Sequence, residues 1–357
     1  MLRRFSSVPA RALRSQRAMS TKVKVVLTRS LPEQGAKLLK EDDRIDAITW
    51  PEDSPCDRQW LLENVKGASG ILCMLNDKCD EELIKAAGDK LKVVSSFSAG
   101  VDHIALGALK ERSVRLGYTP SALTDAVADL TVMLTLMAQR RGGEAMRRVM
   151  NGDWPKMPWS PLLLCGPQIT NSTVGFLGFG RIAQATLARL LPFQISKALY
   201  LGSRPGQPAK EDFYGLVKDQ KIPIQPAKNA QELAEKSDIL IIGCALTPET
   251  KHLVNADFLG RMKETAVIVN IARGPVVDTD ALAKALNSGS IFGAGIDVIE
   301  NEPQIPADHP LAQEPRCVLL PHIGSANTET RSLMAEEAVK NLQAGLFGGS
   351  MVNEKTL

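Results

Sequence analysis

Two features that mark other classes of protein are absent from this 357-residue sequence. No apolar run approaches the ~18 residues that a membrane-spanning helix needs, so we expect no membrane segment. The six cysteines form no C-x-x-C pair, which argues against a zinc site and against a disulfide framework. We interpret them as reduced thiols that pack in cores, because most of their neighbours are apolar. We therefore expect neither a bound metal nor a membrane partner.

Acidic side chains are absent before Glu33, although residues 1–20 are rich in arginine and serine. This composition is typical of a mitochondrial transit peptide, so we predict import into the matrix; Met19 is an internal start that would give a cytosolic form. A basic tail without a targeting role is the alternative. Without the five arginines of this segment the formal net charge of the chain falls from +3 to −2, because 38 basic residues then remain against 40 acidic ones. The basic balance is therefore no sign of nucleic-acid binding. The five are Arg3, Arg4, Arg11, Arg14 and Arg17.

Strand-like and helical patterns alternate from Lys22 onward, in two successive series. A long helical pattern over 124–150, with Thr124 as its expected N-cap, and a Pro-, Gly- and Trp-rich loop over 151–170 separate the series. The alternation predicts an α/β protein with parallel sheets covered by helices on both faces, and the length favours two domains. The expected strands are 23–28, 45–49, 70–74, 92–96, 173–177, 198–201, 239–242, 266–270, 293–297 and 318–320, and the expected helices of the first series and the C-terminus are 33–40, 57–65, 81–87 and 328–346.

The most specific motif is G-x-G-x-x-A over 178–183, between an apolar strand and a helical pattern. Gly178 permits a tight turn, Gly180 lets the backbone approach a pyrophosphate, and Ala183 is small enough for close packing of helix on strand. The free amides of the helix N-terminus, at Arg181 and Ile182, would face the phosphates. The motif predicts a dinucleotide site; a glycine turn in an unrelated sheet is the alternative.

The next strand ends with Ser203 and Arg204, and no acid is present there to bind a ribose 2′-hydroxyl. A hydroxyl and a guanidinium suit a 2′-phosphate, because arginine binds phosphate with charge-assisted hydrogen bonds. We therefore predict that NADP(H) is preferred, with NAD(H) possible. The alternative is that Arg204 points into solvent.

Three later strand ends carry polar residues beside glycine or proline: Arg273, Asp297 with Glu302, and His322. Ligands of open α/β sheets collect at the carboxyl ends of strands, so these side chains are expected to converge. The set suits reduction of a 2-oxo acid. Arg273 would bind the carboxylate, and His322, beside Glu302, would act as general acid; Asp297 would bind the nicotinamide carboxamide. Taken singly, each could be an ordinary polar residue at a strand end.

At these residues the sequence resembles the D-isomer-specific 2-hydroxyacid dehydrogenase family, and within it the reductases of glyoxylate and hydroxypyruvate. The resemblance runs from about Lys22 to the C-terminus. It includes the family order of arginine, glutamate and histidine behind a glycine loop. The segments that carry it are 98–103, 117–120, 151–152, 159–161, 165–166, 262–267 and 320–326.

The resemblance implies further roles. The amides of Ala99 and Gly100 would bind the substrate carboxylate, and Leu75 would cover the substrate. Trp159 would reach the active site of the neighbouring subunit in a homodimer; the loop over 153–158 is about two residues longer than in the family. Residues 21–123 and 325–357 would form a substrate-binding domain and residues 124–324 an NAD(P)-binding domain, both Rossmann-like or flavodoxin-like, with the active site in the cleft between them.

Two alternatives stay open at this point. One is another enzyme of the family, of the phosphoglycerate or lactate type. The other is a dinucleotide-sensing interaction protein like the C-terminal binding protein corepressors, which keep the same three residues. The transit-like N-terminus and the Ser203-Arg204 pair argue against a nuclear NAD sensor.

Overall fold

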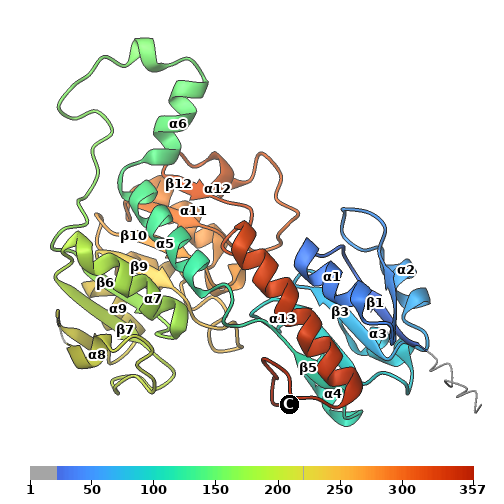
Figure 1. The fold of residues 1–357 in the computed structure, drawn as a ribbon. Coiled ribbons are helices and arrows are strands. Elements are labelled where there is room, and N and C mark those ends of the chain that lie inside the picture. Colours follow the sequence, from blue (N-terminus) through green and yellow to red (C-terminus); the bar gives the residue numbers. More distant parts are fainter. Residues whose placement is uncertain (1–21, 220) are drawn as a thin grey trace, which may run out of the picture.

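The strands form two separate, wholly parallel sheets in the computed structural model, which describes residues 22–219 and 221–357 (Figure 1). The expected targeting segment 1–20 and Met19 lie outside the described residues, so import stays a prediction. The expected α/β class with two parallel sheets is confirmed.

The first sheet has the strand order β2-β1-β3-β4-β5. Side chains of β1 alternate between its faces: Val25 and Leu27 pack in one core and Val26 in the other, as period-two geometry requires. Helices α1 and α13 cover the first face, and α2, α3 and α4 cover the second (Figure 1). The strands are β1 (Val23–Leu27), β2 (Ile45–Thr49), β3 (Gly70–Met74), β4 (Val93–Phe97) and β5 (Arg115–Gly117); the helices are α1 (Glu33–Glu41), α2 (Arg58–Asn64), α3 (Glu81–Ala87), α4 (Leu106–Glu111) and α13 (Thr328–Phe347).

The second sheet has the order β12-β11-β10-β9-β6-β7-β8. In its central strand β9, Ile239 and Ile241 face α5 and α7, whereas Leu240 and Ile242 face α9 to α12. The strands are β6 (Thr173–Leu177), β7 (Lys197–Leu201), β8 (Ile224–Pro226), β9 (Ile239–Ile242), β10 (Val267–Asn270), β11 (Gly293–Ile296) and β12 (Cys317–Leu319). The helices are α5 (Thr124–Gln139), α6 (Gly142–Met150), α7 (Arg181–Leu190), α8 (Leu216–Asp219), α9 (Ala230–Lys236), α10 (Ala256–Gly260), α11 (Thr279–Ser288) and α12 (Pro310–Gln313), with short 3₁₀ turns at Trp154–Lys156, Leu191–Phe193 and Gly274–Val276.

The chain passes between the two sheets twice. Helix α5 packs on β10 and β11 of the second sheet, and α13 returns to pack on β3, β4 and β5 of the first. The first described strand, β1, and the last helix, α13, therefore both belong to the first sheet. In the described part of the chain, no helix combines the length and the apolar character needed to cross a membrane.

The expected single helix over 124–150 is wrong. Helix α5 ends at Gln139, and α6 begins at Gly142 after Arg141, which has a left-handed backbone with φ of 51°. The break falls at Arg140 and Arg141, and the Gly142-Gly143 pair that follows forms the start of α6. The expected N-cap is also wrong: Leu123 holds that position, and the Thr124 hydroxyl has no hydrogen-bond partner among the described residues.

Most expected strands agree with the structure to within one residue at either end. The sequence missed β5 and β8, which have three residues each and lie at sheet edges. Such short strands carry too few residues for an alternating pattern to be recognised.

Candidate active site

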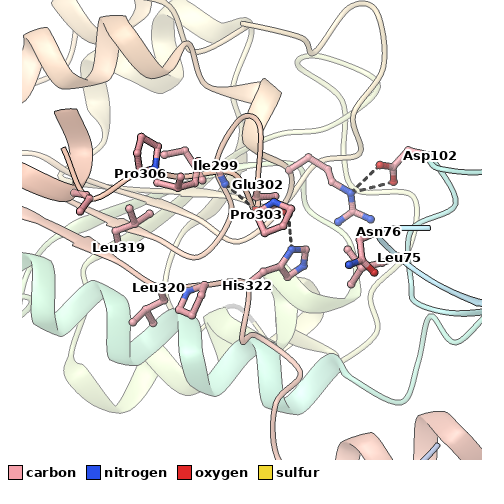
Figure 2. Close-up of a pocket in the computed structure, with 15 residues that line it drawn as sticks. Leu75, Asn76, Asp102, Ile299, Glu302, Pro303, Pro306, Leu319, Leu320 and His322 are labelled. Atoms are coloured by element: carbon pink, nitrogen blue, oxygen red, sulfur yellow. Dashed lines mark hydrogen bonds and ion pairs between the residues drawn. The ribbon is translucent and has the colours of Figure 1, made fainter. Parts of the chain in front are cut away.

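The polar strand ends of the second sheet meet at one cavity because β10, β11 and β12 are neighbours in the sheet. This cavity, of about 640 Å³, is lined by Arg273, Glu302 and His322 (Figure 2). Leu75 and Asn76, which follow β3 of the first sheet, line its other side. The cavity therefore lies between the two sheets.

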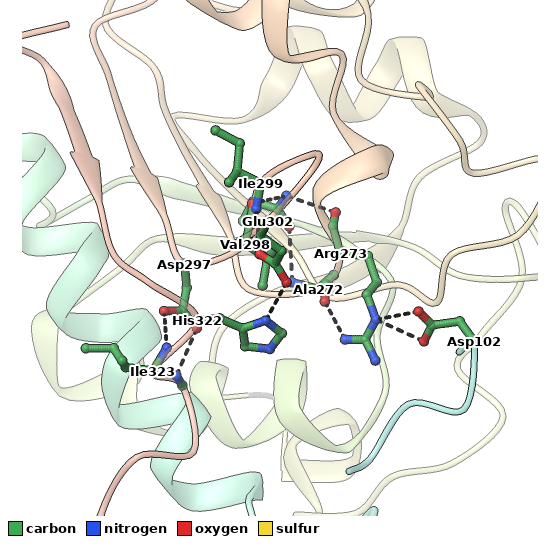
Figure 3. Close-up of polar contacts among 11 residues, drawn as sticks. Asp102, Ala272, Arg273, Asp297, Val298, Ile299, Glu302, His322 and Ile323 are labelled. Atoms are coloured by element: carbon green, nitrogen blue, oxygen red, sulfur yellow. Dashed lines mark hydrogen bonds and ion pairs between the residues drawn. The ribbon is translucent and has the colours of Figure 1, made fainter. Parts of the chain in front are cut away.

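His322 and Glu302 form a hydrogen-bonded pair at this cavity. The imidazole Nδ1 lies 2.6 Å from Glu302 Oε1, and Glu302 Oε2 accepts a hydrogen bond from the backbone amide of Ile299 at 3.1 Å (Figure 3). With Nδ1 bound to the carboxylate, Nε2 is the ring atom left for a ligand. The sequence predicted this pairing, and the structure places the two side chains in contact.

Asp297 lies beneath this pair and is only 2% exposed. Its carboxylate oxygens accept hydrogen bonds from the amides of Ile323 at 2.8 Å and Gly324 at 2.9 Å, while its carbonyl accepts from the amide of His322 (Figure 3). Burial raises the pKa of Asp297, although these amides oppose the shift. Asp297 thus fixes the turn that holds His322, whose φ of 55° lies in the left-handed region. The expected contact of Asp297 with a nicotinamide carboxamide stays a prediction.

Arg273 is held from both sheets. Its Nε donates to the two carboxylate oxygens of Asp102 at 3.0 and 3.2 Å, and its Nη1 donates to the carbonyl of Ala272 at 2.8 Å (Figure 3). The remaining amino group, Nη2, lies against Gly100, where an added Cβ would be 1.6 Å away. A side chain at position 100 would therefore displace the guanidinium of Arg273, and Nη2 is the atom left to bind an anion there.

The turn that carries Arg273 depends on Asn270, which is 1% exposed. The Asn270 side chain donates to the carbonyl of Arg273 at 3.1 Å and accepts from the amide of Ala272 at 3.1 Å. Sequence reasoning assigned no role to Asn270 or Asp102. Asp102 lies inside the segment 98–103 that carries the resemblance. Asn270 ends the expected strand 266–270, and a polar residue at the end of an apolar strand was the available signal there.

Trp159 does not line the cavity of its own chain. It is 85% exposed on the loop after α6, and Figure 1 shows α6 and this loop projecting from the second sheet. Other large apolar side chains on the same projection are exposed as well. They include Met146, Val149, Met150, Trp154 and Leu162.

The glycine loop between β6 and α7 has the geometry of a phosphate site. Gly178 has φ of +90°, and an added Cβ would lie 2.7 Å from the backbone of Cys244, so only glycine fits. An added Cβ at Gly180 would meet nothing within 4 Å, and no side chain caps the helix there. The first amides of α7 are thus open to a ligand, and the residues present fit a dinucleotide. Ala183, 2% exposed, packs near Gly243.

Ser203 and Arg204 are exposed at the end of β7, and Arg204 Nη2 donates to the carbonyl of Pro208 at 3.2 Å. The following loop is tied to α7 by the buried Gln184, whose side chain bonds the carbonyl of Glu211 and the amide of Phe213 at 2.9 Å each. Because β7 lies beside β6 in the sheet, Arg204 follows the strand next to the glycine loop.

Comparison with known proteins agrees with this geometry. Residues 132–324 match the family described as D-isomer specific 2-hydroxyacid dehydrogenase, NAD binding domain. The chain is 44% identical over 335 residues to glyoxylate reductase/hydroxypyruvate reductase of Homo sapiens, covering 94% of this chain and 98% of that one. It is 42% identical over 341 residues to a glyoxylate reductase of Thermofilum pendens, covering 94% and 95%. A crystal structure of NADPH-dependent glyoxylate/hydroxypyruvate reductase from Sinorhizobium meliloti, with NADP and malonate, is similar with a TM-score of 0.79 and 28% identity, covering 94% and 97%.

Proposed function

The chain belongs to the D-isomer-specific 2-hydroxyacid dehydrogenase family and is therefore an oxidoreductase of 2-hydroxy acids, and we propose that it reduces glyoxylate and hydroxypyruvate, to glycolate and D-glycerate, with NADPH as the preferred cofactor. The contact that carries the proposal is the His322–Glu302 pair, which faces Arg273 across one cavity. The printed names of the relatives in Homo sapiens and Sinorhizobium meliloti support the choice of substrate.

Arg273 binds and orients the substrate carboxylate. Asp102 and Ala272 occupy its Nε and Nη1, so Nη2 is directed to the carboxylate beside the amide of Gly100. A charge-assisted hydrogen bond of this kind is worth about 1.5–3 kcal/mol. The position of the carboxylate then fixes where the adjacent carbonyl lies.

His322 donates the proton. The reaction leaves negative charge on the carbonyl oxygen, and Nε2 of a protonated His322 neutralises that charge by proton transfer. Glu302 accepts a hydrogen bond from Nδ1 and so fixes the orientation of the ring and stabilises positive charge on it. When bound, the reduced nicotinamide supplies the hydride to the carbonyl carbon.

Arg204 and Ser203 bind the 2′-phosphate of NADP(H), and the α7 amides at Arg181 and Ile182 bind the pyrophosphate, behind Gly178 and Gly180. No acid follows β7 to repel a 2′-phosphate. The printed description of the Sinorhizobium meliloti relative as NADPH-dependent supports this choice.

Residues 21–123 with 325–357 form the substrate-binding domain, and residues 124–324 form the coenzyme domain. Substrate binding in the cavity brings the two domains together.

A second copy of the chain completes the cavity. The cavity is much larger than glyoxylate and has an apolar end at Ile305, Pro306 and Leu320. Trp159 of the second copy covers that end, because it is exposed on a projecting apolar arm. Sedimentation of the purified protein as a monomer would remove this part of the proposal.

The test is a set of initial rates with NADPH and NADH, each with glyoxylate and hydroxypyruvate, on the wild type and on His322→Asn. We expect fast NADPH-dependent turnover that the substitution abolishes. Arg204→Gln should remove the cofactor preference and leave turnover with NADH intact. Absence of turnover with every pair would overturn the reductase proposal. Rates with 3-phosphohydroxypyruvate and pyruvate would then identify another enzyme of the family, and cofactor binding without turnover would indicate a dinucleotide-sensing protein.

A further inference from the structure

A second, smaller cavity lies at the carboxyl edge of the first sheet. It has a volume of about 290 Å³ and is lined by residues that follow β1, β3 and β4 and by the first turn of α13. Leu75 and Asn76 line this cavity and the catalytic cavity (Figure 2 shows both residues at the latter). Two arginines, Arg29 and Arg331, belong to the smaller cavity alone.

Arg29 follows β1, and its charge is poorly compensated. Its Nε is buried and has no hydrogen-bond partner among the residues that the structure describes. Its Nη1 lies 3.7 Å from Asp53, a side chain fully exposed to water, so this ion pair contributes little. A buried guanidinium nitrogen without an acceptor is costly, because the lost hydrogen bond to water is not replaced.

Arg331 lies in the first turn of α13, which begins at Thr328. Burial lowers the pKa of its guanidinium, and the charge of Asp297 opposes that shift only in part. Within residues 22–219 and 221–357, Arg331 forms no ion pair within 4.0 Å and no side-chain hydrogen bond; its Cζ lies 5.8 Å from the ring of Phe97. A second cation therefore shares the cavity without an anionic partner.

The nearby acid does not neutralise the two arginines. Asp77 is 8% exposed, and one of its oxygens already accepts hydrogen bonds from the hydroxyl of Thr28 and the amide of Met74. It forms no ion pair with Arg29 within 4.0 Å. The two half-buried arginines are therefore only partly compensated, and an anion between them would supply the acceptor that Arg29 Nε lacks.

We propose that this cavity binds a small anion through a carboxylate or phosphate group held between Arg29 and Arg331. Ser30 and Asn76 line the same cavity, and their side chains carry a hydroxyl and an amide that can act as neutral donors. The site differs from the Arg273 site and from the glycine loop, since neither Arg273 nor any residue of that loop lines it. Because it shares Leu75 and Asn76 with the catalytic cavity, an anion bound here fixes one wall of that cavity and alters substrate affinity.

Calorimetric titration of inorganic phosphate into the full chain tests the site directly, without any need for turnover. An Arg204→Gln/Arg273→Gln background removes the two other proposed arginine–anion contacts. In that background, Arg29→Gln and Arg331→Gln should each weaken phosphate binding about tenfold or more, because each removes a charge-assisted contact. Arg29→Lys and Arg331→Lys keep the charge and should retain most of the affinity. A parallel titration with acetate shows whether the site takes phosphate or carboxylate groups.

Arg140→Gln is the matched control. It removes the same charge from an exposed position after α5, outside the cavity, and should leave binding unchanged. Equal loss in the control, or phosphate affinity unchanged by Arg29→Gln and Arg331→Gln together, would overturn the proposal. Where the glutamine variants fail to fold, anomalous scattering from wild-type crystals grown with selenate gives the answer, and a cavity without the anion would equally overturn it.

A kinetic measurement on the unmodified enzyme tests the link between the two cavities. Phosphate should change KM for the 2-oxo acid more than kcat, and Arg29→Gln should abolish that effect. This arm depends on the proposed reductase activity, whereas the titration does not, so the two proposals fail independently.

Discussion

The two halves of the catalytic cavity are built differently. The half proposed to donate the proton, His322 with Glu302, comes entirely from loops that follow strands of the second sheet, and the hydrogen bonds that hold these two side chains are made among residues of those loops. The carboxylate half joins Arg273 of the second sheet to Asp102 and Gly100 of the first. The first half is therefore preorganised by one core, whereas the second depends on how the two sheets are placed relative to each other.

The hydrogen bonds made within the second sheet differ in burial from the one that crosses to the first sheet. Buried Asp297 and Asn270 anchor the turns of His322 and Arg273 with hydrogen bonds to backbone groups. By contrast, the Asp102 side chain that crosses to Arg273 is 42% exposed. Substitutions in the preorganised half should lower kcat, and those at the crossing contact should raise KM.

Removing the proton donor should have the largest effect. His322→Asn is expected to lower kcat by about 10²–10⁴-fold, because general acid catalysis contributes that much, with little change in KM. The measurement is steady-state kinetics with glyoxylate and NADPH. Glu302→Gln, which keeps a hydrogen-bonding partner for the ring, should cost less. If His322→Asn mainly raised KM, the histidine would act in substrate binding, and the two halves of the cavity would not differ in their effects on kcat and KM.

Adding one methyl group at Gly100 should come next. The Cβ of Gly100→Ala would lie 1.6 Å from Arg273 Nη2, so the guanidinium must leave its carboxylate-binding position. Loss of a contact worth about 1.5–3 kcal/mol raises KM by about 10–150-fold, whereas kcat should change less.

Gly107→Ala is the matched control for this substitution. An added Cβ there meets nothing within 4 Å, and helix α4 tolerates alanine. Unchanged KM in Gly100→Ala would mean that Nη2 does not hold the carboxylate.

Breaking the crossing ion pair should have a smaller effect. Asp102→Asn removes the charge opposite Arg273 Nε, and exposed pairs of this kind contribute about 0.2–1 kcal/mol, which corresponds to a change in KM of up to about fivefold. The effect should shrink in high salt because the charges are exposed to solvent. A loss in kcat as large as that of His322→Asn would show that Asp102 belongs to the preorganised half.

The sequence predicted the preorganised half better than the crossing contact. The alternating apolar pattern located the parallel strands, and parallel strands bring their carboxyl ends together, so Arg273, Glu302 and His322 could be grouped from their positions alone. The Asp102–Arg273 pair joins residues 171 positions apart across two sheets, and no local pattern encodes that distance. The end of α5 at Gln139 was not predicted, because the apolar residues on both sides of it keep a helical period.

The orientation of side chains was also beyond the sequence. Asp297 was correctly expected at a strand end, but only the folded structure shows that its carboxylate accepts hydrogen bonds from the amides of Ile323 and Gly324. The same holds for Arg29 and Arg331, which are separated along the chain and meet around one cavity only in the folded protein.

The smallest expected effect concerns a pair that supports the loop of Glu302. His252 Nε2 lies 2.7 Å from Glu300 Oε1, and the other oxygen of Glu300 accepts from the amide of Thr279. Burial would raise the pKa of Glu300, but the hydrogen bonds from His252 and Thr279 outweigh it and lower that pKa.

A carboxyl whose pKa is lower in the folded protein stabilises the fold above its unfolded pKa. That stabilisation is lost as pH falls through the folded pKa. Glu300→Gln should therefore reduce the free energy of unfolding by up to about 1 kcal/mol at pH 7, and by progressively less as the pH falls below the ordinary value for glutamate. Urea unfolding of both proteins from pH 7 to pH 3.5 measures this difference. A difference that stays constant over this range would mean that Glu300 acts by packing rather than by charge.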